Sequence, residues 1–501
     1  MRHYFYFLTF ISLIIAFTAC KDEETVALKS SVASFVSSHQ DVIGYGYVDI
    51  KTILKKGEIE SLSGIGSFFK NQMSEMEKGI SIKNGIHYAM TGPLDREGLP
   101  EKVFMFMSVE NKDSLQGMFE EMGYPFEEEK GVMMYDDMTT AIGFNDQLAI
   151  MITSTAEGDI KDELKTSFIK VTDKKQNPKV VEILDLETDI LLGTNLANLY
   201  STSNTSLNSL SAEQRKEITE MVEDGHYSTS VDFNPGNITI SANTERISDK
   251  LKEAFFFKSD NSNKIVSKLG PGKPSIAFSA ALDIPKMEKF LKRMNPQATK
   301  DLYRSLGMGG FFLHALGGEG IGSVVSGELG FALNTVPDMQ SAMIPEFNFY
   351  AGLGENNELV NDLISTFGEE GDVEDLGDGY YRYDQSMAKV NSDEFILHSN
   401  EESKETFKIS TLERVRGMES FGDKPFSLFV DIKQLKAAEF PMPSKEAELL
   451  LELADYLMIE ADNSGAKIVL QFTDTNQNAL GQIVGALKKK LEDQFGGGLM
   501  M

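Results

Sequence analysis

A strand-like run that ends in an acidic or amide residue, with an amphipathic stretch after it, occurs four times in this chain. The run 42–48 ends at Asp49, and similar runs precede Asn195, Asp283 and Asp431. Such side chains accept hydrogen bonds from the free N–H groups of a helix's first turn, so each of these positions predicts a helix start. Asp283 lies 234 residues after Asp49, and Asp431 lies 236 residues after Asn195. The four starts therefore predict two halves with one plan.

Other features recur in the same order. Residues 64–69 match 307–312 at an offset of 243, and residues 141–150 match 388–397 at an offset of 247. Collinear matches at a nearly constant offset predict a tandem duplication. Within each half, hairpins alternate with single helices, as at the Asn234-Pro235-Gly236-Asn237 turn. We expect an α+β fold of two similar domains, each a mainly antiparallel sheet with helices on one face.

Breaks in periodicity and in composition set the predicted domain limits. The segments are a lipoprotein signal peptide (1–19), a lipid anchor and tether (20–40), a first α+β repeat domain (41–257), a linker (258–273), a second α+β repeat domain (274–494) and a flexible tail (495–501). Three elements are also predicted: one strand over 140–152, one helix over 445–458 and a hairpin turn over 474–478. The Phe255-Phe256-Phe257 triplet has two interpretations, packing between the halves or an exposed binding patch.

Cys20, the only cysteine of the chain, follows an apolar run over 4–17 and the small residue Ala19. A short apolar run with small residues before the cut is typical of a secretory signal peptide. The run is shorter than the ~20 residues that a membrane-spanning helix needs. The stretch resembles a bacterial lipobox, although Phe17 stands where an aliphatic residue is usual. We therefore expect Cys20 to be lipidated.

The residues after Cys20 predict where the lipoprotein goes. They resemble the signal that sends lipoproteins of Bacteroidota to the cell surface, and they are Lys21, Asp22, Glu23 and Glu24. Several acyl chains on one cysteine hold a protein stably, because each buried CH₂ contributes ~0.8 kcal/mol. We expect an outer-membrane, lipid-anchored protein on the cell surface, with a periplasm-facing orientation as the alternative.

Composition excludes some functions. The formal net charge is −29 at pH 7, and such an acidic chain repels nucleic acid at long range. Its largest basic cluster, Lys488-Lys489-Lys490, is typical of a solvated helix end. The chain contains no tryptophan, which weakens a sugar-binding interpretation without removing it. Phe and Tyr rings could stack on a sugar instead.

The sequence predicts no catalytic, cofactor-binding or metal-binding residue, and no cofactor. Nucleophile-elbow, zinc-protease and phosphate-loop motifs are all missing. The histidines after the signal peptide lack the spacing of metal ligands, and they are His39, His87, His226, His314 and His398. Asp136-Asp137 corresponds to Asp384-Gln385 in the other half, so an acidic pair is not repeated. The segment 474–478 begins like a calcium loop but lacks its glycine and its closing glutamate.

The layout resembles a family of Bacteroidota lipoproteins defined by a domain of unknown function. The resemblance rests on the Val48-Asp49-Ile50 type of helix start and on Asn84-Gly85-Ile86 before a strand, and it covers most of the mature chain. It implies no activity. We expect a non-enzymatic binding or scaffold module, held at the membrane through Cys20, with an envelope protein or glycan as partner. The alternatives are an envelope hydrolase with its site between the halves and a carrier of an apolar ligand.

Overall fold

The chain forms two compact units. Unit 1 comprises residues 1–209, 219–248 and 475–501, and unit 2 comprises residues 210–218 and 249–474. The computed structural model describes residues 22–59, 71, 74–95, 98–156, 158, 160–173, 175–202, 211–258, 263–294, 321–334, 345–355, 360, 373–399, 404–408, 412–438 and 445–495. The signal peptide, Cys20, Lys21, both glycine-rich segments 64–69 and 307–312, and the tail after residue 495 lie outside these ranges. Asp22, Glu23 and Glu24 lie in a helix whose side chains are described only from residue 27 onward.

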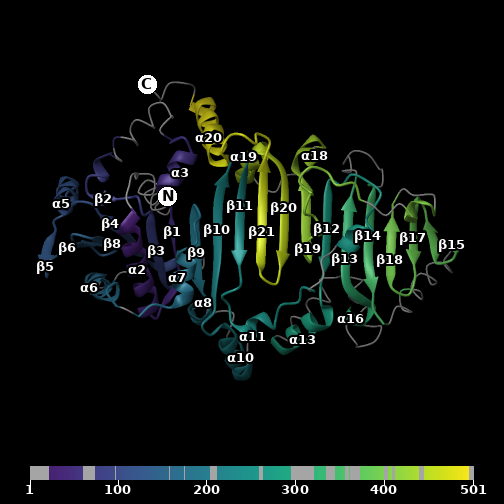
Figure 1. Cartoon of the computed structure of the whole chain (residues 1–501), viewed down its shortest axis with the longest axis horizontal. Coiled ribbons are helices and arrows are strands. Elements are labelled where there is room, and N and C mark those ends of the chain that lie inside the picture. Colours follow the sequence, from purple (N-terminus) through teal and green to yellow (C-terminus); the bar gives the residue numbers. More distant parts are fainter. Residues whose placement is uncertain are drawn as a thin grey trace. The chain divides into compact units, whose positions relative to one another are not determined.

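Unit 1 contains an antiparallel sheet (Figure 1). Its strands pair in the order β5 (Glu127–Glu129), β6 (Val132–Asp136), β7 (Thr140–Phe144), β8 (Leu148–Ser154), β4 (Pro100–Val109), β3 (Ile86–Leu94), β1 (Val42–Val48), β9 (Ile190–Asn195), β10 (His226–Asn234) and β11 (Asn237–Asn243). The short strand β2 (Ile80–Ser81) also pairs with β4. The hairpin predicted between β10 and β11 is confirmed, and Gly236 takes the positive φ of 74° that its turn requires.

Helices cover both faces of the unit 1 sheet around β4, so the expectation of helices on one face is wrong for this unit. Strand β4 shows why, because Phe104 and Phe106 join one core cluster while Met105 and Met107 join another. Alternate residues of a strand point to opposite faces. The first cluster is covered by α2 (Asp22–Ser38), α6 (Ile160–Lys170) and α7 (Pro178–Leu184), and the second by α3 (Ile50–Lys56) and α5 (Lys112–Glu121).

Helix α2 replaces most of the tether expected over 20–40. Its side chains Leu28, Val32 and Phe35 are buried in the core of unit 1. The ring of Phe35 lies 4.9 Å from that of Phe104 and 5.0 Å from that of Phe106. Apolar residues at i, i+4 and i+7 share one helix face. The sequence predicts a polar tether here, because serines lie between these apolar residues.

Unit 2 contains a second antiparallel sheet. Its strands pair in the order β15 (Glu374–Gly377), β16 (Tyr380–Tyr383), β17 (Ser386–Val390), β18 (Glu394–His398), β14 (Phe347–Leu353), β13 (Val325–Leu333), β12 (Ile276–Ala281), β19 (Phe426–Asp431), β20 (Ala454–Asp462) and β21 (Gly465–Phe472). This order matches that of unit 1 strand for strand. The mainly antiparallel α+β class is therefore confirmed.

Further helices complete the described chain. They are α8 (Leu196–Thr202), α10 (Ala212–Val222), α11 (Asp249–Lys252), α12 (Asn263–Val266), α13 (Ile284–Met294), α16 (Ile321–Val324), the 3₁₀ helix η2 (Thr406–Lys408), α18 (Ile432–Ala437), α19 (Lys445–Leu453) and α20 (Ala479–Phe495). All four predicted helix caps are confirmed. In each case the backbone N–H of the third residue after the cap donates to the cap side chain. The distance is 3.0 Å for Asp49, 3.1 Å for Asn195, 3.0 Å for Asp283 and 2.8 Å for Asp431.

The structure differs from the prediction in two segments. The linker expected over 258–273 contains α12, and Ile265 and Leu269 in this region are buried in the core of unit 2. Residues 475–494, expected in the second domain, belong to unit 1. There the Nδ2 atom of Asn478 donates to the carbonyl of Phe233 at 2.8 Å. Phe257 pairs with Leu282 within unit 2, and all three rings of the Phe255–Phe257 triplet are half-buried.

Three element predictions are wrong in detail. The strand expected over 140–152 is two strands, because Asn145 Oδ1 accepts the N–H groups of Gln147 and Leu148 and forms a turn. The helix expected over 445–458 ends at Leu453, and β20 begins at the next residue. The predicted hairpin turn over 474–478 instead leads from β21 into α20.

Candidate functional site

A polar cavity of about 670 Å³ lies within unit 1. Its wall comes from the end of α2, the start of α7, the β9–α8 junction and the start of β10. The lining residues are Val36, Ser37, His39, Gln40, Lys175, Gln176, Asn177, Pro178, Val180, Asn195, Asn198, Asp224 and His226. The volume lies within the ~300–1,000 Å³ typical of small-molecule sites, but most such sites are more apolar than this one.

His226 is buried in this wall and has two polar neighbours. Its Nδ1 atom lies 2.9 Å from the hydroxyl of Tyr45, and its Nε2 atom lies 3.4 Å from Nδ2 of Asn177. The Oδ1 atom of Asn177 accepts the N–H of Lys179, which assigns the amide orientation and presents the NH₂ group to His226. The ring therefore carries its proton on Nδ1 and stays neutral. Burial lowers the pKa of His226 to about 4.

The carboxylate of Asp224 is already neutralised within unit 1. Lys179 Nζ lies 3.1 Å from its Oδ2 atom, and Asn177 Nδ2 lies 3.3 Å from its Oδ1 atom. Burial opposes ionisation of this carboxyl, but the Lys179 ammonium outweighs that effect and holds the pKa of Asp224 below its ordinary value. Asp224 therefore offers the cavity no unbalanced charge.

Two asparagines at the start of α8 form the rest of the polar wall. The Oδ1 atom of Asn195 accepts the N–H of Asn198 at 3.1 Å. The Nδ2 atom of Asn198 donates to the carbonyl of Val42 at 2.7 Å. Each side chain is fixed through one of its two polar atoms, and both line the cavity.

His226 is suited to hydrogen bonding more than to proton transfer. A histidine with a pKa of about 4 is a weak base at neutral pH. Its described partners are a phenol and an amide, whereas the hydrolase alternative requires a histidine with two carboxylates in hydrogen-bond reach. The sequence did not identify this site, because its segments are separated by up to 190 residues and no local motif marks them.

Unit 2 contains a smaller cavity of about 520 Å³. Its lining residues are Lys258, Asp283, Pro285, Glu288, Ser323, Ser326, Gly354 and Glu355. Asp283 is also the cap of α13. Within the described residues, no group of three or more His, Cys, Asp or Glu side chains is placed to hold a metal ion.

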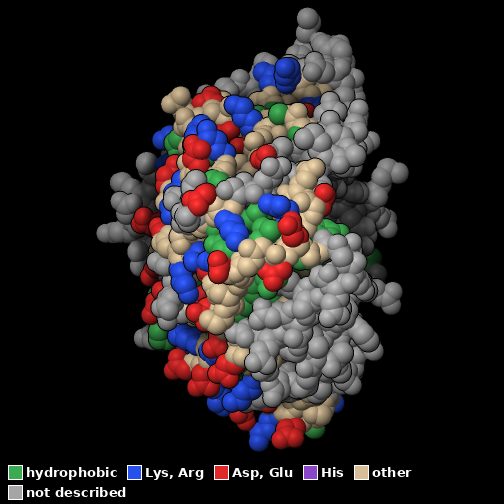
Figure 2. Space-filling view, turned by 90° about the vertical axis from the view of Figure 1, so that its right-hand side faces the viewer, with side chains coloured by type: hydrophobic (Ala, Val, Ile, Leu, Met, Phe, Trp, Pro, Cys, Tyr) green, Lys and Arg blue, Asp and Glu red, His purple; other side chains and the backbone are tan. Residues whose placement is uncertain are grey.

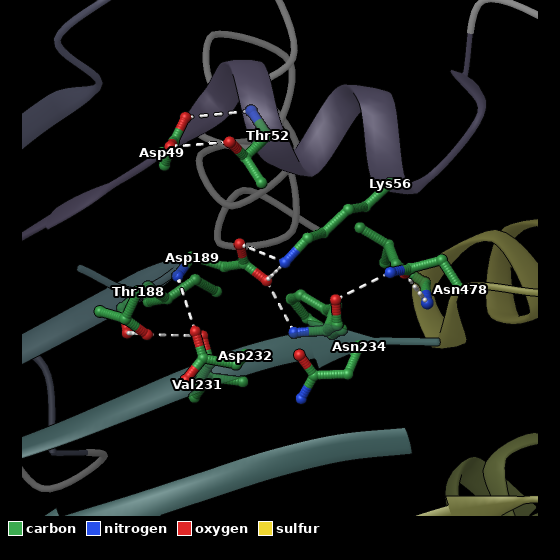
Figure 3. A network of polar contacts seen from close by, with 12 residues as sticks. Asp49, Thr52, Lys56, Thr188, Asp189, Val231, Asp232, Asn234 and Asn478 are labelled. Atoms are coloured by element: carbon green, nitrogen blue, oxygen red, sulfur yellow. Dashed lines mark hydrogen bonds and ion pairs between the residues drawn. The ribbon is translucent and has the colours of Figure 1, made fainter. Parts of the chain in front are cut away.

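A separate polar network lies at the opposite ends of β9 and β10 (Figure 3). Asp189, which is 3 % exposed, lies 2.7 Å from Lys56 Nζ and accepts the N–H of Phe233 at 2.6 Å. Its own N–H donates to Asp232 at 3.3 Å. Figure 3 shows these side chains directed toward one another, beside the Asn478 contact. We interpret this network as structural, because its polar atoms are used in joining α3, β9 and β10.

The remaining histidines and acidic pairs lie apart from one another. His87 is buried with its ring 5.3 Å from that of Tyr47, and His398 is buried with Nδ1 2.6 Å from Asn348 Oδ1. His39 lines the unit 1 cavity, and His314 lies outside the described residues. Asp137 accepts the N–H groups of two threonines in the β6–β7 turn.

Charges on the face drawn in Figure 2 are interspersed, with Lys and Arg beside Asp and Glu over its described part. In unit 2, Glu394 lies 2.8 Å from Lys268 and 3.2 Å from Lys389. Local pairing of this kind offsets part of the acidic excess. Within the described residues, no helix is both long enough and apolar enough to cross a membrane.

Comparison with known proteins gives little further information. No family model and no curated protein matches the chain. Crystal form III of the protein TP0453 is 12 % identical and covers 44 % of this chain and 83 % of its own, with a TM-score of 0.26. Crystal form I of TP0453 is 13 % identical and covers 43 % of this chain and 80 % of its own, with a TM-score of 0.25. Similarity at this level carries no argument about function.

Proposed function

We propose that this protein is a lipid-anchored envelope protein that binds a small ligand in the polar cavity of unit 1 and does not transform it. The observation that carries the proposal is the state of the cavity's ionisable groups. His226 is held neutral by burial and by Asn177, and Asp224 is neutralised by Lys179. The part of the wall formed by His226 and Asp224 can hold hydrogen-bonding groups in place but supplies no strong acid or base.

Our proposal for the location is the outer membrane, at the cell surface. It rests on the lipobox resemblance at Cys20 and on the acidic residues that follow it. Helix α2 begins at Asp22 and is packed into unit 1, so a lipid on Cys20 would be joined almost directly to a folded domain. Lipidation would therefore hold unit 1 close to the bilayer.

We also propose that the two units arose by tandem duplication and that the chain belongs to the lipoprotein family it resembles. The shared strand order and the matching helix caps in both units support the duplication. The binding site is then a specialisation of unit 1. Helices α2 and α7 form two walls of the site. In the described part of unit 2, no helix of similar length stands at the corresponding places in the strand order, and the helix that directly precedes its first strand is the short α12.

The anchor is tested with Cys20→Ala. We expect the variant protein to appear in the soluble envelope fraction, while the wild-type chain sediments with membranes and is released only by detergent. Protease treatment of intact cells reports on surface exposure, since only a surface-exposed chain is cleaved. A Cys20→Ala chain that still sediments with membranes would refute lipid anchoring.

The binding role is tested by mass spectrometry of small molecules extracted from the purified protein. The matched variant is Gln40→Trp, which fills the cavity from an exposed position and should leave the fold intact. We expect a compound that co-purifies with the wild-type chain and is lost from the variant. Identical extracts from both proteins would count against a ligand in this cavity.

A further inference from the structure

The two asparagines of the cavity have complementary polar atoms left over. Asn195 uses Oδ1 as the cap of α8, which leaves the Nδ2 donor, and Asn198 uses Nδ2 on the Val42 carbonyl, which leaves the Oδ1 acceptor. Neither remaining atom forms a hydrogen bond with another described residue. Because each side chain is held at its other end, the spare donor and acceptor are fixed in direction before any ligand arrives.

The wall formed by Asp224 and His226 offers no net charge to an ion. Asp224 is paired with Lys179, and His226 is neutral because Asn177 presents an NH₂ group to its Nε2 atom. A second proton on His226 would place two donors face to face. Lys175 also lines the cavity, but from an exposed position, where its interaction with another charge is weakened by water. His39 lines it too, with Nε2 3.9 Å from Glu163 Oε1.

We propose that the cavity selects a small uncharged ligand whose groups both donate and accept hydrogen bonds, that is, hydroxyl or amide groups. This inference rests on the proposed binding function and deepens it by specifying the ligand class. A charged ligand held against the Asp224–His226 wall would lose its hydration without gaining a counter-charge there. An apolar ligand would leave the asparagine atoms unpaired, so both are selected against.

Two sources of this chemistry are a neutral sugar and a neutral peptide fragment, and the probes separate them. For sugars, N-acetylglucosamine is compared with its protonated parent glucosamine. For peptides, N-acetylalanine amide is compared with N-acetylalanine, which carries a carboxylate. Binding is measured by calorimetry at millimolar concentrations and neutral pH, on the full mature chain carrying Cys20→Ala so that it is soluble.

The decisive variant is Asn195→Asp. Aspartate still accepts the N–H of Asn198 and caps α8, but it replaces the spare donor with an acceptor. Asn195→Ser also keeps the cap and adds no charge. The matched control is Asp431→Asn, the reverse exchange at the cap of α18 in unit 2. We expect both Asn195 variants to bind the neutral probe about tenfold more weakly and the control to bind like the wild-type chain.

The outcomes separate this inference from the proposed function. Binding of either neutral probe, with loss in both Asn195 variants, supports the ligand class and identifies its source. If a charged member binds as well as its neutral counterpart, or if the Asn195 variants bind normally, the ligand class is wrong while the binding function stands. If no probe binds, the ligand class is overturned. If in addition nothing co-purifies with the chain, the binding function falls with it.

Discussion

Asp189 carries a buried charge whose partners come from separate segments of unit 1. Lys56 on α3 supplies the counter-charge at 2.7 Å, and Phe233 on β10 supplies a backbone N–H at 2.6 Å. The carbonyl of Asp189 also accepts the N–H of Asp49 at 2.8 Å. A buried ion pair contributes little net stability, but a buried charge that loses its partner is costly. The pair therefore fixes how α3 sits on the sheet.

Replacing Lys56 with methionine tests this role. The side chain of Lys56 is 26 % exposed, so water offsets part of the loss, and we expect the free energy of unfolding to fall by about 2 kcal/mol. Urea unfolding followed by circular dichroism measures the change. The control is Lys78→Met, which removes the exposed Lys78–Glu75 pair and should cost less than about 0.5 kcal/mol. Equal losses in the two variants would show that the buried pair has no special role.

Helix α2 is an element of the unit 1 core. Phe35 is fully buried and touches the rings of Phe104 and Phe106 on β4. The same helix ends at the cavity, where Ser37 accepts the N–H of Asn177 at 2.7 Å. Packing of α2 and the shape of the cavity are therefore linked.

The variant Phe35→Ala tests α2 as a core element. Removing a buried aromatic ring leaves a void, and we expect the stability of unit 1 to fall by about 3 kcal/mol, as judged by chemical unfolding. Ile169→Ala, at a side chain of α6 that is 71 % exposed, is the control and should change stability by less than about 0.5 kcal/mol. A flexible tether would tolerate Phe35→Ala as well as the control, and that result would exclude the packed helix.

Local chemistry explains which elements the sequence could predict. The caps at Asp49, Asn195, Asp283 and Asp431 depend on an N–H three residues away, so their signal is contained within one turn. The sequence assigns residues 454–458 to the end of a helix. They form the first part of β20, because pairing with β19 and β21 overrides their helix-compatible composition. The cavity depends on the whole topology, which brings α2, α7, α8 and β10 together.

Both units contain a neutral histidine that acid should charge. In unit 1 this is His226, and in unit 2 it is His398, whose Nδ1–H donates to Oδ1 of Asn348. The amide of Asn348 is oriented by two carbonyls that accept from its Nδ2 atom. Burial lowers the pKa of each histidine to about 4. Unit 1 contains a second such ring, His87, whose pKa burial lowers to about 3. Among the described residues, unit 1 therefore has two acid-sensitive histidines of this kind and unit 2 has one.

The sign of the pH effect follows from these pKa values. Between the unfolded pKa of about 6.5 and the folded pKa of about 4, the unfolded chain binds more protons, so stability falls as the pH falls. Each histidine should remove about 3 kcal/mol of stability over this window, with no further loss below about pH 4. Urea unfolding of the full chain, repeated across the window, measures the slope.

The variant His398→Gln isolates this effect from the acidic background. Protonation of carboxylates also changes the charge of a chain that carries −29 at neutral pH, and it does so in the wild-type chain and the variant alike. We expect the acid-induced loss in unit 2 to shrink in the variant, while unit 1 keeps the full slope contributed by His226 and His87. An unchanged slope in unit 2 would mean that the ring of His398 is protonated as easily in the folded chain as in the unfolded one, because only a difference in proton binding produces a slope.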